Sequence, residues 1–220
     1  MTNAAKAAAG EVTAAASREY LGRVQKKRKL WLRAAVAVSL MVMPFVMSRW
    51  AEGSRIHELL EHLGLALIAA CILGRAWCTL YIGGRKAHEL VEIGPYSLMR
   101  NPLYFFSFMG ALGVGMQSGS LTIGLFFLGI ALAVFLPVVR REEAILQGMF
   151  GDPFSAYCAR VPRFWPRITA WRDAKAVTFS PGLFYVTLRD GLVFLCAVPF
   201  FELIDVLQRS HILPAMAALP

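Results

Sequence analysis

The chain has 220 residues, of which 57% are hydrophobic and 17% are charged, and its formal net charge is +9. In soluble domains about a quarter of the residues are charged, which is more than in this chain. An ordinary globular core would not bury this many apolar side chains. The length fits one domain, and the composition predicts an integral membrane protein. A charge of +9 would suit nucleic-acid binding in a soluble protein. Here the basic residues cluster beside apolar segments, and we expect the bilayer, not nucleic acid, as the partner.

Residues 1–29 form an Ala-rich polar arm that ends in a basic cluster at 26–29. Five apolar stretches follow, and we predict that each crosses the membrane. They are Leu30–Met47, Leu59–Leu80, Leu103–Met116, Leu121–Val139 and Leu188–Leu207. The expected fold class is therefore all-α, a multi-pass transmembrane helical bundle with about five spans. We divide it into the arm (1–29), a membrane domain (30–182, with its motif core at 81–167) and an additional C-terminal helix and tail (183–220).

The basic residues are unevenly distributed over the predicted loops. If the N-terminus is cytoplasmic, seventeen Lys and Arg residues fall in cytoplasmic segments and three in outer segments. Cytoplasmic loops carry an excess of Lys and Arg, so this asymmetry predicts an N-terminus inside and a C-terminus outside. In a bacterium the membrane would be the inner one. The regions 81–104 and 140–167 then share the cytoplasmic face.

A polar motif follows the second predicted span. It reads Gly94-Pro-Tyr-Ser-Leu-Met-Arg-Asn-Pro-Leu-Tyr104, and Arg140-Arg-Glu-Glu143 and Phe150-Gly151 come later in the chain. Polar groups kept at membrane depth usually serve a site. The ordered combination resembles the isoprenylcysteine carboxyl methyltransferase family and its phospholipid methyltransferase relatives. Their signature runs Gly-x-Tyr, Arg-His-Pro-x-Tyr, Glu-Glu and Phe-Gly.

The resemblance implies an enzyme that uses S-adenosyl-L-methionine, bound in a cytoplasmic pocket between the helices. It implies cofactor contacts by residues of the two motif regions, namely Tyr81, His88, Glu89, Leu90, Val91, Tyr96, Arg100, Asn101, Pro102, Leu103, Tyr104 and Glu142. Asn101 stands where the family has His. An amide forms hydrogen bonds but does not titrate, so we expect no proton relay at this position.

The implied reaction is a direct methyl displacement, which gains mainly from positioning and from exclusion of water. The resemblance implies a lipidic or hydrophobic acceptor, and two classes stay open. A prenylcysteine carboxylate is already an anion, whereas a headgroup ammonium must first lose a proton. Glu143 is the candidate proton acceptor. Arg140 and Arg141 are candidate replacements for the family's substrate-facing arginine, whose place is taken by Val138.

A downstream region, Phe150–Tyr157 and Val161–Pro166, resembles the segment that closes the cofactor pocket in the family. Its aromatic and basic residues equally suit a lipid headgroup interface without a catalytic role. Both interpretations stay open at this point.

Two other functional classes compete with the methyltransferase. A membrane reductase of the sterol-reductase type would bind NADPH and would need a basic pocket for its phosphate. The candidates for such a pocket are Arg140, Arg141, Arg160 and Arg163. A non-catalytic membrane protein would use the polar motif as a structural re-entrant segment.

No metal site is expected from the sequence. The four cysteines lack metal-ligand spacing, and no carboxylate or second histidine is recognised at ligand spacing from a histidine. We therefore interpret His57, His62 and His211 as structural, and Glu58 and Glu61 as the polar start of the second span.

Overall fold

The computed structural model of the chain describes residues 45–50, 53–84, 89–210, 212 and 217–219. Its helices are α2 (Arg55–Ile82), α3 (Pro95–Leu98), α4 (Pro102–Met116), α5 (Leu121–Phe150), α6 (Asp152–Arg160), α7 (Pro181–Leu192) and α8 (Ala197–Arg209), with short 3-10 helices η2 (Ile168–Ala170) and η3 (Val193–Cys196). A three-residue strand β1 (Val46–Ser48) pairs in parallel with β2 (Ala217–Leu219). The architecture confirms the all-α class, because these two strands are a minor addition to the helices.

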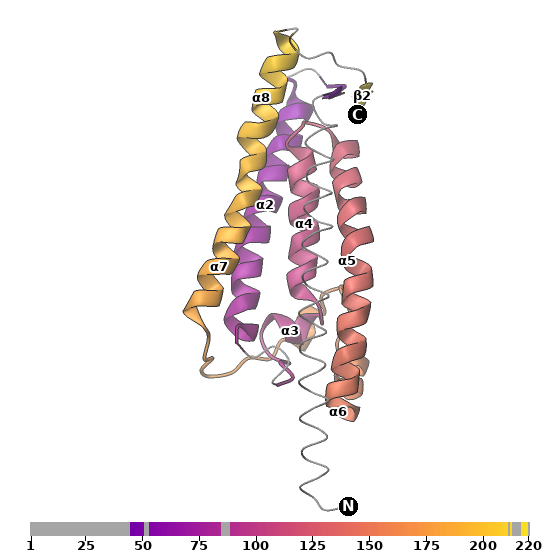
Figure 1. Ribbon diagram of the computed structural model, residues 1–220, viewed down its shortest axis with the longest axis vertical. Helices are drawn as coiled ribbons and strands as arrows, with labels where there is room; N and C mark the ends of the chain where they lie inside the picture. Colours follow the sequence, from indigo (N-terminus) through magenta and orange to yellow (C-terminus); the bar gives the residue numbers. More distant parts are fainter. Residues whose placement is uncertain (1–44, 51–52, 85–88, 211, 213–216, 220) are drawn as a thin grey trace, which may run out of the picture.

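The long helices form an elongated bundle in which α4 lies between α2 and α5, and α7, η3 and α8 continue in one line beside α2 (Figure 1). The helices α3 and α6 and the start of α4 lie together at one end, which we call the motif end. The start of α2, the turn at 117–120 and the end of α8 lie at the other, which we call the opposite end. The two predicted motif regions therefore meet although they are distant in sequence.

Side-chain caps and proline define where the helices begin. The Ser54 hydroxyl accepts a hydrogen bond from the His57 backbone N–H at 3.4 Å, and the buried Ser120 hydroxyl accepts one from Ile123 N–H at 3.3 Å. These bonds satisfy N–H groups that have no partner within the helix. The helix α4 begins at Pro102, whose missing N–H costs nothing in a first turn.

The helices α2 and α4 approach each other so closely that their backbones touch at Gly64 and Gly113. A Cβ atom on Gly113 would lie 2.5 Å from the carbonyl oxygen of Gly64, closer than atoms can pack. Small residues permit such contacts between helices in membranes, where helix association depends on close packing and not on the hydrophobic effect.

The predicted spans agree with the observed helices in part. Two helices, α2 and α5, are long and apolar enough to cross a membrane, whereas α4 has 15 residues. The predicted span Leu30–Met47 lies outside the described residues except at its end, where Val46 and Met47 belong to β1 and not to a helix. The predicted last span corresponds to the line of α7, η3 and α8. The count of five spans and the orientation stay predictions.

The helix that contains the predicted span Leu121–Val139 does not end at Val139. The helix α5 continues to Phe150, so Arg140–Glu143 are helical, and α6 follows after Gly151. The residues after Val139 include good helix formers, and the helix ends where Gly151 adopts a φ of +58°.

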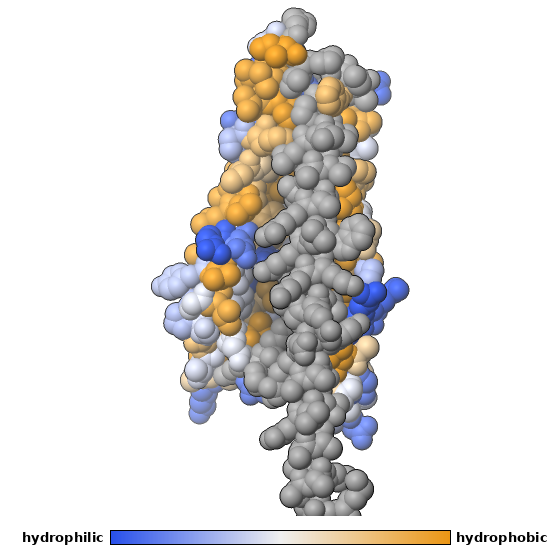
Figure 2. Space-filling view, viewed as in Figure 1, coloured by the Kyte–Doolittle hydropathy of each residue, from blue (hydrophilic) through white to orange (hydrophobic). Residues whose placement is uncertain are grey.

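Apolar side chains also cover the outside of the bundle. Figure 2 shows hydrophobic residues over α8 and more hydrophilic ones toward the motif end. Large hydrophobic side chains are exposed on α5, α7 and α8 and between them, among them Leu125, Phe126, Val193, Leu203 and Val206. Such an exterior suits lipid contact, as the composition predicts.

Candidate functional site

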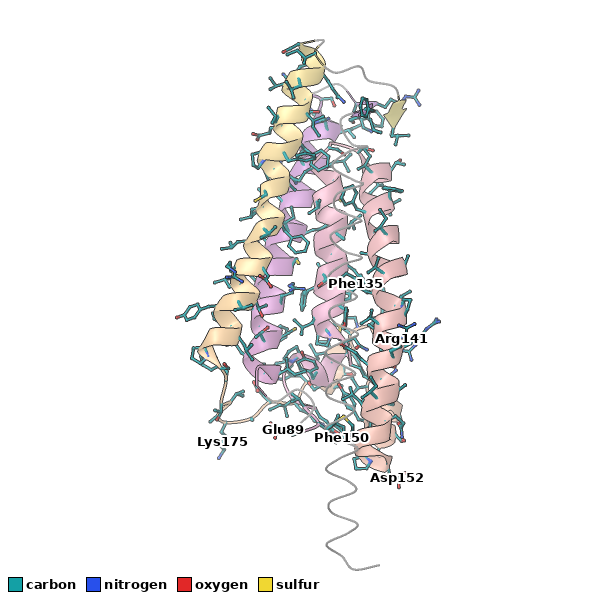
Figure 3. All side chains as sticks on the ribbon, viewed as in Figure 1. Glu89, Phe135, Arg141, Phe150, Asp152 and Lys175 are labelled. Carbon is teal, nitrogen blue, oxygen red and sulfur yellow. The ribbon has the colours of Figure 1, made fainter. Side chains whose placement is uncertain are left out.

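The face of α5 that packs on α4 changes from apolar to acidic at the motif end. Phe135 and Val139 are buried in a cluster with Tyr104, and Figure 3 places Phe135 between the two helices. Glu142 and Glu143 follow one turn later, and they are 5% and 9% exposed. Residues three and four apart lie on one face of a helix, so the acidic pair continues the buried stripe. Buried carboxylates require partners.

Glu143 receives hydrogen bonds from three side chains. Its Oε1 accepts from Asn101 Nδ2 at 2.8 Å and from Arg100 Nε at 3.2 Å. Its Oε2 accepts from Arg163 Nη2 at 2.7 Å and from Arg163 Nε at 3.0 Å. The bond with Glu143 raises the pKa of the Arg163 guanidinium, so this pair stays ionised. The cluster joins the start of α4, the end of α5 and the segment after α6.

The segment after α6 is also joined to the motif through its backbone. Hydrogen bonds run from Arg100 N to Pro162 O (2.8 Å), from Arg167 N to Leu98 O (3.0 Å) and from Gly94 N to Arg172 O (2.7 Å). The buried Tyr157 hydroxyl donates to the Tyr96 carbonyl at 2.8 Å, and burial raises the pKa of this phenol. The region expected to resemble a closing segment thus contacts the motif directly. Whether it caps a cofactor stays a prediction.

Gly94 begins α3 in a conformation that a side chain would disturb. Its φ is +59°, and a Cβ atom there would lie 2.3 Å from the aromatic ring of Tyr81. The Tyr81 hydroxyl donates to Asp173 Oδ1 at 3.1 Å. The glycine therefore lets the end of α2 pack directly under the motif turn.

Tyr96 is the least satisfied residue of the motif. It is 5% exposed, and its hydroxyl has no hydrogen-bond partner among the residues that the structure describes. Burial raises the pKa of this phenol well above its ordinary value, and the nearby Cys78, Tyr157 and Glu142 add to the shift. A buried polar group without a partner costs about 1–3 kcal/mol. Such a group in a folded protein requires an explanation, and a bound molecule that completes its hydrogen bonding is one.

The structure brings most of the predicted cofactor residues together at the motif end. Tyr81, Val91 and Tyr96 share one cluster, against which Leu103 packs; Leu90 packs on the α6 cluster; and Pro102 is fully buried. Arg100 and Asn101 turn to Glu143. Glu89 is exposed at the same end (Figure 3), and His88 lies outside the described residues.

Arg140 and Arg141 are not brought to this cluster. Both are exposed, and Figure 3 shows Arg141 pointing away from the bundle. Val138, at the position of the family's substrate-facing arginine, is buried among apolar residues. A catalytic role for either arginine stays a prediction that this geometry does not support.

A cavity of about 160 Å³ opens at the motif end. It is lined by Glu92, Ser97, Arg160, Val161, Thr169, Ala170, Trp171 and Arg172. Ligand pockets usually measure roughly 300–1,000 Å³, and this lining includes neither Glu142 nor Tyr104. The expected cofactor pocket therefore stays a prediction, carried by the buried polar groups and not by this cavity.

Two contacts were not identified from the sequence. Arg163 is the closest partner of Glu143, and its position in Val161-Pro-Arg was the available signal. At the opposite end, the expectation that no carboxylate stands at ligand spacing from a histidine is wrong. Glu61 follows His57 by one helical turn, and its Oε1 lies 3.2 Å from His57 Nε2.

Comparison with known proteins agrees with this arrangement. The model of the phospholipid methyltransferase family matches residues 62–153, a range that contains α3, α4 and the Glu142–Glu143 pair. The nickel-cobalt-cadmium resistance protein NccN of Alcaligenes xylosoxydans xylosoxydans is 33% identical over 87% of this chain and 88% of its own length. The cobalt-zinc-cadmium resistance protein CzcN of Cupriavidus metallidurans is 35% identical over 85% and 86%. No solved structure matches the chain.

Proposed function

This chain belongs to the phospholipid methyltransferase family, and we propose that it transfers a methyl group from S-adenosylmethionine to a lipidic or hydrophobic acceptor at the motif end. The observation that supports this most is the buried Tyr96 hydroxyl, which has no partner among the described residues. Burial raises the pKa of this phenol, and the charge of the buried Glu142 contributes to the shift. A protein that used the motif as scaffold alone would gain stability by replacing that hydroxyl.

The residues at the motif end fit this cofactor chemically. S-adenosylmethionine presents an ammonium group and ribose hydroxyls as donors, and when bound it supplies an electrophilic methyl carbon. Glu142 is the acceptor for such donors, and Tyr96 offers a hydroxyl that can donate or accept. On the membrane side, the aromatic rings of Tyr104 and Phe135, whose centroids lie 5.4 Å apart, exclude water from the apolar face.

Glu143 has a positioning role in this proposal. Its two oxygens already accept four hydrogen bonds from Arg100, Asn101 and Arg163. To take up a proton from the molecule that is methylated, Glu143 would have to give up one of these hydrogen bonds. The carboxylate instead fixes the start of α4 against the end of α5, and it thereby orients Glu142 beside the motif. This arrangement favours an acceptor that arrives already deprotonated, as a carboxylate does.

The two named relatives are associated with resistance to metal ions. We extend that association to this chain as part of the proposal, with the methylated product serving tolerance of divalent metals. A host made sensitive to Co²⁺ or Cd²⁺ should regain tolerance with the parent protein and fail to regain it with a variant that does not bind the cofactor.

The reductase alternative has less support from the geometry. Its phosphate pocket would need several arginines without carboxylate partners. Arg160 Nη2 lies 2.6 Å from Glu92 Oε2, Arg163 is paired with Glu143, and Arg140 and Arg141 are exposed on α5. No shared basic pocket forms among these four described residues.

Calorimetric titration of the detergent-solubilised protein with S-adenosylmethionine and with NADPH tests the proposal. We expect saturable binding of S-adenosylmethionine alone. Glu142→Gln keeps the size of the side chain and removes the charge, so it should weaken binding by about ten- to hundredfold, for a loss of roughly 1.5–3 kcal/mol. Glu202→Gln, an exposed carboxylate on α8, is the matched control and should bind as the parent does.

Tyr96→Phe separates a binding role from a structural one. Because the hydroxyl has no partner in the protein, its removal should leave the unfolding temperature unchanged or higher. Cofactor binding should weaken by about two- to tenfold, since one neutral hydrogen bond contributes roughly 0.5–1.5 kcal/mol. NADPH binding by the parent would favour the reductase, and binding of neither cofactor would favour a non-catalytic protein.

A further inference from the structure

A second group of chemically reactive side chains lies at the opposite end of the bundle. His57 and Glu61 stand one turn apart on α2, and Asp205 comes from α8. One ligand atom from each of these residues lies within 4.8 Å of the ligand atoms of the other two. The methyl-transfer proposal uses none of the three.

His57 is poorly explained as a structural residue. It is 3% exposed, and its Nδ1 atom has no hydrogen-bond partner among the described residues. The other ring nitrogen, Nε2, points at Glu61 Oε1 at 3.2 Å. The cost of burying this imidazole is therefore offset by one weak contact with a half-buried carboxylate. A cation bound between the two groups would offset the cost of burying both.

The surrounding structure holds these groups in place. The Ser54 hydroxyl caps α2 through His57 N–H, and Gln117 Nε2 donates to the Glu61 backbone carbonyl at 2.8 Å. The imidazole lies against Gly119, where a Cβ atom would overlap it. On α8, Phe201 and Ile204 are buried in a cluster with residues of α2, and they fix the helix that carries Asp205.

The geometry points to one class of ion. Zn²⁺ binds nitrogen and carboxylate oxygen at about 2.0–2.2 Å in a tetrahedron, which separates its ligand atoms by roughly 3.3 Å. The His57–Glu61 distance of 3.2 Å already matches, and Asp205 offers a third ligand atom within 4.8 Å of the other two. An imidazole ligand favours Zn²⁺ and its transition-metal neighbours over Ca²⁺ and Mg²⁺, which prefer oxygen.

We propose that His57, Glu61 and Asp205 form a binding site for a single transition-metal dication of the Zn²⁺ and Co²⁺ type. Three protein ligands leave a fourth position for water. Between His57 and Tyr81, α2 rises about 36 Å, so this site lies more than the thickness of a hydrocarbon core from the motif end. The ion therefore binds without contact with the proposed cofactor.

Titration of tag-free, full-length protein in detergent with Zn²⁺, and with Co²⁺ followed by visible absorption, tests the proposal in the absence of any methyl donor. We expect one ion per chain and a Co²⁺ spectrum of low-symmetry, tetrahedral type. Glu61→Gln and Asp205→Asn keep side-chain size, and each should weaken Zn²⁺ binding by about tenfold or more. The double variant should show no saturable binding.

Glu202→Gln is the matched control, because it removes an exposed carboxylate from the same helix, one turn from Asp205. It should bind Zn²⁺ as the parent does. Unfolding temperatures measured in chelator should be equal for all variants. Added Zn²⁺ should raise the unfolding temperature of the parent and of Glu202→Gln most, that of the single variants less, and that of the double variant not at all. Parent protein that binds no Zn²⁺ at micromolar concentration, or a double variant that binds like the parent, would overturn the proposal.

Discussion

Glu143 is the residue on which the geometry of the motif end most depends. Its side chain is 11% exposed, that of Arg100 13% and that of Arg163 43%. We expect Glu143→Gln to lower the free energy of unfolding by about 3 kcal/mol, because it leaves the largely buried Arg100 without a countercharge. Arg163→Gln should cost about 1 kcal/mol, since this guanidinium is more accessible to water. Denaturant unfolding in detergent micelles measures both.

A smaller loss for Glu143→Gln than for Arg163→Gln would contradict this ranking. Asp152→Asn, an exposed carboxylate of α6 at the same end, serves as the control and should be close to neutral.

At this scale, the sequence predicted which residues gather but not how they pair. The motif spacing brought Arg100, Asn101 and the two glutamates to one end, as the structure shows. It did not distinguish the roles of Glu142 and Glu143, because adjacent helical residues point about 100° apart and partner choice depends on tertiary packing. The His57–Glu61 contact, by contrast, was readable from its spacing alone.

Among the elements, the turn that begins α3 is the most sensitive to substitution. Gly94→Ala introduces a Cβ atom at a positive φ and into the ring of Tyr81, so α2 and the motif turn must separate. We expect a clear fall in unfolding temperature and a loss of S-adenosylmethionine binding. Strain of this kind typically costs 1–3 kcal/mol. Thermal unfolding and calorimetry of the same sample report both effects.

Gly148→Ala is the matched control for that change. Gly148 lies within α5, and a Cβ atom there would meet nothing within 4 Å. Alanine is the better helix former, so this variant should gain up to about 1 kcal/mol. A Gly94→Ala variant as stable as the Gly148→Ala variant would show that the motif turn tolerates a side chain.

The elements themselves were predictable where hydropathy decides them. The apolar stretches that begin near Leu59, Leu103 and Leu121 became α2, α4 and α5. The ends of these helices were predicted less accurately, because charged residues such as Arg140 and Glu142 can continue a helix as well as end a membrane segment. The pairing of β1 with β2 was not foreseen, since three-residue strands far apart in sequence leave no periodic pattern.

The whole molecule carries a cluster of ionisable side chains at each end, and the chemistry of the two clusters differs. The motif end gathers arginines around Glu143, whereas the opposite end holds His57, Glu61 and Asp205. Basic residues concentrate on the cytoplasmic side of membrane proteins, so the sequence-based prediction would place the motif end on the cytoplasmic side. A cytosolic cofactor and an extracytoplasmic metal ion would then reach the protein from opposite sides.

Cysteine labelling of intact cells with a membrane-impermeant reagent tests that orientation. Lys175 is exposed at the motif end (Figure 3), and Arg55 is exposed at the start of α2. In a Cys158→Ser, Cys196→Ser background, the two native thiols that are not buried are absent. We expect Arg55→Cys to react in intact cells and Lys175→Cys to react after permeabilisation, because the two positions lie at opposite ends of the bundle (Figure 1). Reaction of both cysteines from the same side would contradict a bundle that spans the bilayer. The reversed pattern would place the metal ligands in the cytoplasm and the motif end outside, away from any cytosolic methyl donor.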